Sequence, residues 1–210
     1  MVDNIDWLGH DSFRLTGSRT VYIDPWRLVP GAPIADLILV THEHHDHFSP
    51  DDIAAVSGPA TIVVGPAEVA RHLAHVHHIA AGETLTLAGV TVTAVPAYNT
   101  DKFKAAGQVF HPQEDGKVGY IVEFDGRRVY HAGDTDVIPE MAHIVVDVAL
   151  LPVGGTYTMT AEEAAQACGM LRAGTVVPMH FGTIVGSTAD ALRLAELCPL
   201  PVQILSPVSP

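Results

Sequence analysis

Apolar and polar positions along the chain predict strands and helices that alternate from one end to the other. Apolar runs typical of strands cover residues 4–17, 19–25, 35–42, 60–65, 145–151, 175–180 and 202–207. Alternating apolar and polar residues around Gly89 and around Asp125-Gly126 predict two hairpins, over residues 83–96 and 118–132. Start signals and helical spacing predict helices over residues 49–58, 66–78, 160–173 and 188–198.

This order of elements fits one domain over residues 1–210 with two sheets between outer helices. Such an arrangement is an α/β fold of the four-layer αββα type. A single doubly wound parallel sheet is the competing arrangement. The two hairpins argue against it, because tight turns join antiparallel strands and have no place in a purely parallel sheet.

Composition excludes several classes of partner. The chain has 24 acids against 11 bases and a net charge of −13, so it gains nothing from counterion release on nucleic acid. No apolar run approaches the ~18 residues of a membrane span, and residues 1–13 lack a signal-peptide pattern. We expect a cytoplasmic protein without nucleic-acid or membrane partners, whose Cys168 and Cys198 are reduced buried thiols. Homo-oligomer formation is left open.

The segment VTHEHHDHFSP, residues 40–50, carries four histidines and two acids directly after an apolar run. Residues two apart in an extended chain point the same way, so His42 and His44 can share one metal ion. Asp46 and His47 come after the chain turns and can face a second ion. A solvated, histidine-rich turn is the alternative. The position after a buried strand favours a metal site, for zinc, manganese or iron.

Two other predicted strands end in residues of the same chemistry. Asp134 follows Gly133 after the second hairpin, and His180 ends the strand over residues 175–180. Each alone is more often a capping acid or a buried core histidine. Together with the first cluster, they favour two metal sites at one edge of the sandwich.

These motifs resemble those of the metallo-β-lactamase-fold hydrolases, and of their small stand-alone bacterial and archaeal branch in particular. The resemblance rests on His42-x-His44-x-Asp46-His47, Gly133-Asp134-Thr135 and Pro178-Met179-His180-Phe181, and it covers nearly the whole chain. It implies the αββα fold and a site for one or two zinc ions, with manganese or iron as alternatives. It also implies that Asp134 bridges two metals and that His180 joins Asp46 and His47 at the second.

One position departs from the family pattern. Where the family has a third histidine for the first metal, this chain has Asn99. Asn99 could bind weakly or through water, or His111 could fold back and replace the missing ligand. We favour His111, because imidazole is the better ligand. The remaining alternative is that His111 is an exposed loop residue and the first site is weak or empty.

The loop around Asn99 also bears on substrate. All three lysines of the chain, Lys102, Lys104 and Lys117, lie within residues 101–117, where they could attract an anion to the metal site. Loops are also simply where lysines occur. Tyr98 is a candidate hydrogen-bond donor to substrate, or a residue that packs beneath the loop.

The other histidines receive weaker assignments. His10, His131 and the acid Asp24 are expected to support the metal ligands. A structural role is expected for His143 in a buried strand, and a solvated helix end for the group His72, His75, His77 and His78.

Together these features predict a metal-dependent hydrolase. A metal lowers the pKa of bound water from about 15.7 towards ~7, so a metal-bound hydroxide would attack an ester-like bond. No Gly-x-Ser-x-Gly elbow suggests a serine nucleophile instead. Asp46 would orient the hydroxide, and Tyr98, His111 or a lysine would stabilise charge or protonate the leaving group. A phosphodiester or lactone of a small anionic substrate is expected; a redox or non-catalytic metal-binding protein of the same fold is the alternative.

Overall fold

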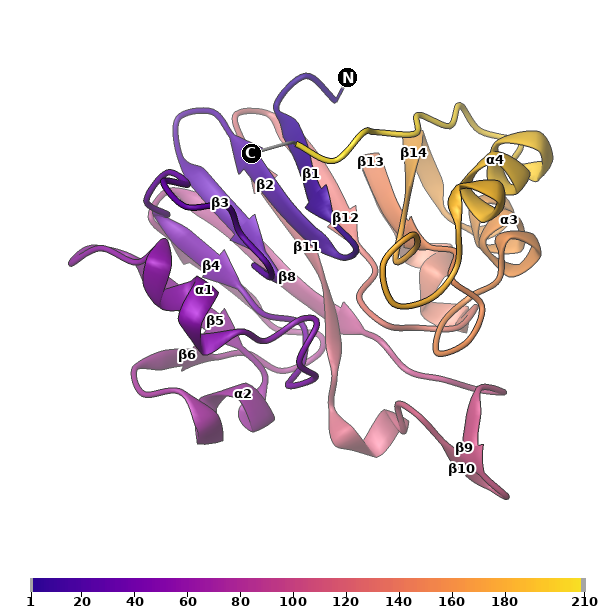
Figure 1. Ribbon diagram of the computed structural model, residues 1–210, viewed down its shortest axis with the longest axis horizontal. Helices are drawn as coiled ribbons and strands as arrows, with labels where there is room; N and C mark the ends of the chain where they lie inside the picture. The colour runs from indigo at the N-terminus through magenta and orange to yellow at the C-terminus, as the bar shows by residue number, and fades with distance from the viewer. Residues whose placement is uncertain (1, 209–210) are drawn as a thin grey trace.

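Two β-sheets packed face to face form the centre of the protein, as the computed structural model of residues 2–208 shows (Figure 1). Within these residues each sheet has six strands, in the orders β1-β2-β3-β4-β5-β6 and β14-β13-β12-β11-β8-β7, and β9 and β10 form a separate ribbon. The strands are β1 Ile5–Gly9, β2 Ser12–Thr16, β3 Thr20–Ile23, β4 Leu37–Leu39, β5 Ile62–Gly65, β6 Val76–His78, β7 Thr84–Leu87, β8 Val90–Pro96, β9 Phe103–Ala105, β10 Gln108–Val109, β11 Val118–Phe124, β12 Arg127–His131, β13 Val145–Pro152 and β14 Arg172–Met179.

Helices cover the outer face of each sheet. In Figure 1, α1 (Pro50–Ala55) and α2 (Ala67–His72) lie on the first sheet, and α3 (Ala161–Met170) and α4 (Thr188–Leu197) lie on the second. The predicted αββα sandwich is confirmed, and both predicted hairpins are present, as β7–β8 and β11–β12.

Strand β4 is apolar at every position because both of its faces are covered. Leu37 and Leu39 belong to the core between the two sheets, whereas Ile38 packs on the other face with Ile53 of α1 and Val69 of α2. A strand that is covered on both faces has no solvent side, so alternation is absent there.

The helix starts follow local capping chemistry. Ser49 accepts a hydrogen bond from the backbone N–H of Asp52, and Pro50 begins α1. Thr160 and Glu163 form the predicted capping box at the start of α3, because each side chain bonds the other residue's backbone N–H.

Parallel pairing brings three strand ends to one edge of the sandwich. β4 lies parallel to β3, and β13 lies parallel to both β12 and β14. Backbone hydrogen bonds join the sheets there, from Val118 N–H to the Thr41 carbonyl (3.2 Å) and from His180 N–H to the His10 carbonyl (3.1 Å). The segments that follow β4, β12 and β14 therefore meet, and these are the segments with the candidate ligands.

Three sequence-based expectations about local structure were wrong. The helix predicted over residues 66–78 ends at His72, because residues 76–78 pair with β5 as strand β6 and this pairing overrides the helical spacing. His143 is exposed at the end of the 3₁₀-helix Pro139–His143 rather than in a buried strand. The strand predicted over residues 202–207 is reduced to one bridge, from Val202 to Val176.

Both cysteines are free, as predicted, although Cys198 is only half-buried whereas Cys168 is buried. No helix within residues 2–208 is long and apolar enough to cross a membrane.

Candidate metal centre

Two neighbouring groups of histidines and acids occupy the edge where the strand ends meet. They comprise three sets, and within each set the candidate ligand atoms lie within 4.8 Å of one another: His42, His44 and His111; His10, Asp11, Asp46 and His180; and Asp11, His47, Asp134 and His180. The last two sets share Asp11 and His180 and are taken together as the second group. The first group contains His42, His44 and His111, and the second draws on His10, Asp11, Asp46, His47, Asp134 and His180. All seven residues predicted as metal ligands lie in one group or the other. Glu43 and His45 belong to neither group.

The first group is a set of three imidazoles. His44 Nδ1 lies 3.1 Å from His42 Nε2 and 3.2 Å from His111 Nε2. Ligand atoms around a tetrahedral zinc ion with bonds of 2.0–2.1 Å are separated by roughly 3.3–3.4 Å. The spacing of the three nitrogens therefore suits a single metal ion. His111 fills the third position despite the 67 residues between it and His44 in the chain.

Asn99 orients His111 and does not join the group. Its amide nitrogen donates to the Asp136 carboxylate (3.1 Å) and to the Tyr157 carbonyl (2.9 Å), two acceptors that fix the orientation of the amide. Its oxygen then accepts from the backbone N–H of His111 (2.9 Å) and from His111 Nδ1 (2.7 Å). Because Nδ1 must donate in this bond, Nε2 carries the lone pair that faces His44.

Asp134 lies between the two groups. Its Oδ1 is 3.2 Å from His47 Nε2 and 3.5 Å from His180 Nε2. Its Oδ2 is 3.4 Å from His111 Nε2 and 4.0 Å from His42 Nε2. The backbone before Asp134 requires glycine, because Gly133 has a φ of +64° and its Cβ position is 2.8 Å from the Val118 carbonyl.

Asp24 and His131 lie behind the ligands, as the sequence suggested. Asp24 is fully buried and accepts from His47 Nδ1 (2.7 Å) and from the Thr41 backbone and hydroxyl (2.7 and 2.6 Å). It therefore holds the His47 ring with Nε2 towards the second group. His131 accepts from the Gly133 N–H (3.2 Å) and donates to the Asp11 carbonyl (2.8 Å).

The two groups have opposite protonation behaviour. Burial lowers the pKa of His42 and His44, and it lowers that of His111 to about 4, so the first group is neutral imidazole at pH 7. In the second group burial also opposes charge, but Asp11 and Asp134 raise the pKa of His180 to about 9 and that of His47 well above its usual value. Protons on these histidines balance the buried carboxylates.

Several buried polar atoms of the second group have no hydrogen-bond partner within residues 2–208. They are both ring nitrogens of His10 and His180, both oxygens of Asp11, His47 Nε2 and Asp134 Oδ1. Buried polar groups are otherwise almost always paired. Imidazole nitrogens and carboxylate oxygens that converge without protein partners fit a bound cation, so the residues are compatible with a metal.

A small pocket opens above the ligands. It has a volume of about 140 Å³, and its walls include the apolar side chains of Phe110, Tyr157 and Ile184. The rings of Phe110 and Tyr157 meet edge to face with centroids 4.8 Å apart. The ligands at its floor are His44, Asp46, His111 and Asp134.

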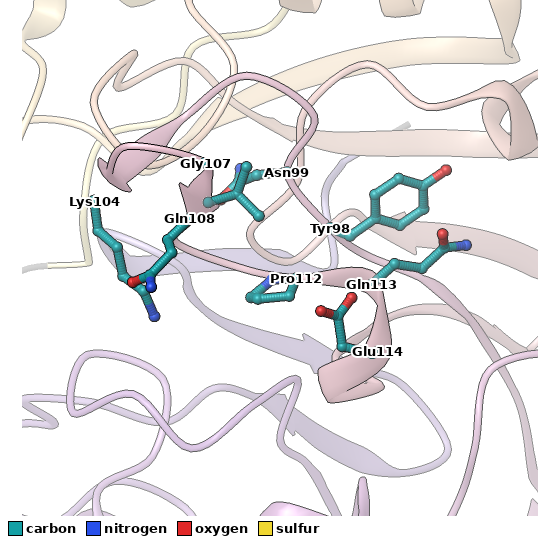
Figure 2. A pocket seen from close by; sticks show the side chains of 9 residues that line it. Tyr98, Asn99, Lys104, Gly107, Gln108, Pro112, Gln113 and Glu114 are labelled. Atoms are coloured by element: carbon teal, nitrogen blue, oxygen red, sulfur yellow. The ribbon is translucent and has the colours of Figure 1, made fainter.

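Tyr98 does not line this pocket. Its hydroxyl donates to Glu140 (3.1 Å), and its ring lines a separate hollow of about 400 Å³ beside the β9–β10 ribbon (Figure 2). Tyr157, which the sequence gave no reason to single out, lies where Tyr98 was expected.

The lysines near the site are largely neutralised. Lys117 is buried and bonds the Glu43 carboxylate (2.6 and 2.8 Å). Lys102 bonds Glu163 (2.9 Å) and Asp101, and Lys104 lines the separate hollow of Figure 2. No lysine or arginine within residues 2–208 lines the metal pocket. The reason for expecting anion attraction there is therefore removed.

Asp11 is the buried acid that sequence reasoning missed. It adjoins His10 at the turn between β1 and β2, and only His10 of this pair was expected to support the metal ligands. Gly9 is the sequence signal for this turn. It has a φ of +112°, and His10 after it has a φ of +52°.

Comparison with known proteins agrees with the geometry. Residues 4–180 match the family model described as the beta-lactamase superfamily domain. A UPF0173 metal-dependent hydrolase of Methanoculleus marisnigri is 40% identical over 192 residues, which cover 85% of this chain and 81% of the relative.

Two solved structures are similar over almost their whole length. A protein of Parabacteroides distasonis has a TM-score of 0.84 and 34% identity, over 95% of this chain and 91% of that one. A metallo hydrolase of Ignicoccus hospitalis has a TM-score of 0.76 and 26% identity, over 97% and 94%. The chain therefore belongs to the UPF0173 family of metal-dependent hydrolases, within the beta-lactamase superfamily.

Proposed function

We propose that the two groups hold two metal ions and that the protein hydrolyses an ester-like bond in a small substrate, with lactones as the preferred class. His42, His44 and His111 would hold the first ion, and Asp46, His47 and His180 the second. The observation that carries this proposal is the position of Asp134, which has one carboxylate oxygen towards each group.

When bound, the metal ions would lower the pKa of a coordinated water and polarise the oxygen under attack. Asp46 is ionised at neutral pH, because His10 and His47 hold its pKa well below the usual range against the effect of burial. Its carboxylate lines the pocket and can accept a hydrogen bond from a water molecule there, which would orient that water.

His111 is better suited to bind metal than to protonate a leaving group. One of its ring nitrogens bonds Asn99, and the other faces His44, so neither is directed at a substrate. We propose that Tyr157 contacts the substrate in place of Tyr98, since it lines the pocket.

The pocket favours a lactone over a phosphodiester. A phosphodiester brings a negative charge to a chain of net charge −13, and no lysine or arginine within residues 2–208 lines the pocket to receive it. The apolar surfaces of Phe110, Tyr157 and Ile184 suit the uncharged carbon ring of a lactone.

The test is hydrolysis by chelator-treated protein that has been reloaded with zinc or manganese. We expect turnover of simple lactones, no turnover without metal, and loss of turnover in His44→Ala. Lys104→Ala, outside the pocket, is the matched control and should match the wild type. Metal-loaded protein that leaves lactones intact but cleaves bis-p-nitrophenyl phosphate would overturn the substrate class.

The redox alternative is separated by metal analysis of the protein as purified, before chelator treatment. A protein that retains two irons and reduces dioxygen, without turnover of either substrate, would replace the hydrolase proposal.

A further inference from the structure

Asp11 is a fully buried acid whose carboxylate oxygens have no hydrogen-bond partner within residues 2–208. The turn that carries it joins β1 and β2 of the first sheet and is fixed by two segments of the second. His131 donates to the Asp11 carbonyl (2.8 Å), and the His180 N–H donates to the adjacent His10 carbonyl (3.1 Å). The backbone is thus held in place while the side chain reaches into the second group.

Its position relative to the ligands fits direct coordination. Asp11 Oδ2 lies 3.2 Å from His47 Nε2 and 3.8 Å from His180 Nε2. Two atoms bound to one metal at about 2.1 Å cannot be more than roughly 4.2 Å apart. Both distances are below this limit, as are those from Asp134 Oδ1 to the same nitrogens, 3.2 and 3.5 Å.

The energetics require a partner for this carboxylate. Burial of an ionised carboxyl without hydrogen bonds or an opposite charge is strongly unfavourable. In the metal-free protein the imidazoles of His10, His47 and His180 are its neighbours, with His10 Nε2 at 3.4 Å. A divalent cation among these atoms would supply the compensating charge in place of the protons on these imidazoles.

We propose that Asp11 is an additional ligand of the second metal ion, beside Asp46, His47, Asp134 and His180, and that it raises the preference of this site for manganese over zinc. Three carboxylates with two imidazoles exceed the four ligands that zinc usually takes. Oxygen-rich sets with higher coordination numbers suit manganese. The inference rests on the proposed metal site and is independent of the proposed substrate.

The experiment measures metal affinity rather than turnover. Manganese and zinc dissociation constants are determined by chelator competition in a His44→Ala background, which disables the first group. Asp11→Asn should weaken manganese binding by more than about 100-fold, the upper end of what loss of a supporting residue costs, and should weaken zinc binding less. Losses below about tenfold for both metals would overturn the proposal, and so would equal losses.

Asp6→Asn is the matched control. Asp6 lies on the same hairpin, but its carboxylate bonds Arg14 (2.8 and 2.9 Å) outside both groups. Its affinities should equal those of the background protein.

A second measurement uses the unaltered second site, in case Asp11→Asn fails to fold. Cobalt(II) in a five- or six-coordinate site absorbs visible light far more weakly than in a tetrahedral site. Cobalt bound to the His44→Ala protein should give the weak spectrum, and an intense tetrahedral spectrum would contradict the proposal.

The outcomes separate this inference from the proposed function. If Asp11→Asn changes metal preference as expected and the wild type leaves lactones intact, only the substrate proposal fails. If lactone turnover is present but Asp11→Asn binds both metals normally, only the role of Asp11 fails.

Discussion

Substitution of Asn99 tests whether this residue positions a ligand or is one. Its side chain takes part in four hydrogen bonds, two to His111 and one each to Asp136 and the Tyr157 carbonyl. Asn99→Ala leaves the His111 N–H and the Tyr157 carbonyl unpaired in a region that is largely buried. Each such group costs about 1–3 kcal/mol, so we expect the metal-free protein to lose about 2–6 kcal/mol of unfolding free energy.

The effect on metal binding should be smaller than that of losing the ligand itself. Loss of a residue that orients a metal-binding histidine costs about 10–100-fold in affinity, or about 1.4–2.7 kcal/mol. His111→Ala should cost far more, because it removes a nitrogen of the first group. Asn99→Asp keeps an acceptor for His111 Nδ1 but places a second carboxylate beside Asp136. It should therefore bind metal well and lower the stability of the metal-free protein.

The assays are chelator competition for metal affinity and urea unfolding of chelator-treated protein. Asn4, the chain's other asparagine, is exposed, and Asn4→Ala serves as the control. Two results would refute the reasoning: Asn99→Ala abolishing the first site as completely as His111→Ala while the metal-free protein keeps its stability, or Asn99→Ala leaving both quantities unchanged.

Two further predictions concern the second group. Gly154→Ala should weaken metal binding at the second site and cost about 1–3 kcal/mol of stability, because its Cβ would lie 2.4 Å from the His180 carbonyl and 2.9 Å from His180 Nδ1. Gly169→Ala is the control, because open space surrounds that position. Equal metal affinities in the two variants would contradict the prediction. Between pH 6 and 7.5, metal affinity at the first site should change little, because the pKa of His111 is about 4. Metal affinity at the second site should rise with pH, by up to tenfold per pH unit for each proton displaced, because His47 and His180 are protonated there and the pKa of His180 is about 9. Titrations of variants that retain one group would contradict the assignment if the two slopes were equal or reversed.

The sequence by itself was sufficient for the fold class and for most of the candidate ligands. Hairpin turns, capping signals and apolar runs are local features, and they gave the layers and most element positions. His42, His44, Asp46 and His47 follow one strand directly, so their placement depends on little more than where that strand ends. Asp134 and His180 could be added because parallel strands end at a common edge.

Tertiary structure decided whatever depends on contacts between distant segments. His111 reaches His44 across 67 residues because Asn99 holds the loop, and no local pattern distinguishes that outcome from an exposed histidine. Lys117 likewise pairs with Glu43, 74 residues away, so its positive charge is neutralised and is not available to attract an anion to the site. Asp11 enters the site because its turn, in the first sheet, is anchored by His131 and His180 of the second. Local propensity fixes most of the elements, with β6 as the exception. The side-chain partners at the site are selected by how loops close over long separations, which a single sequence does not display.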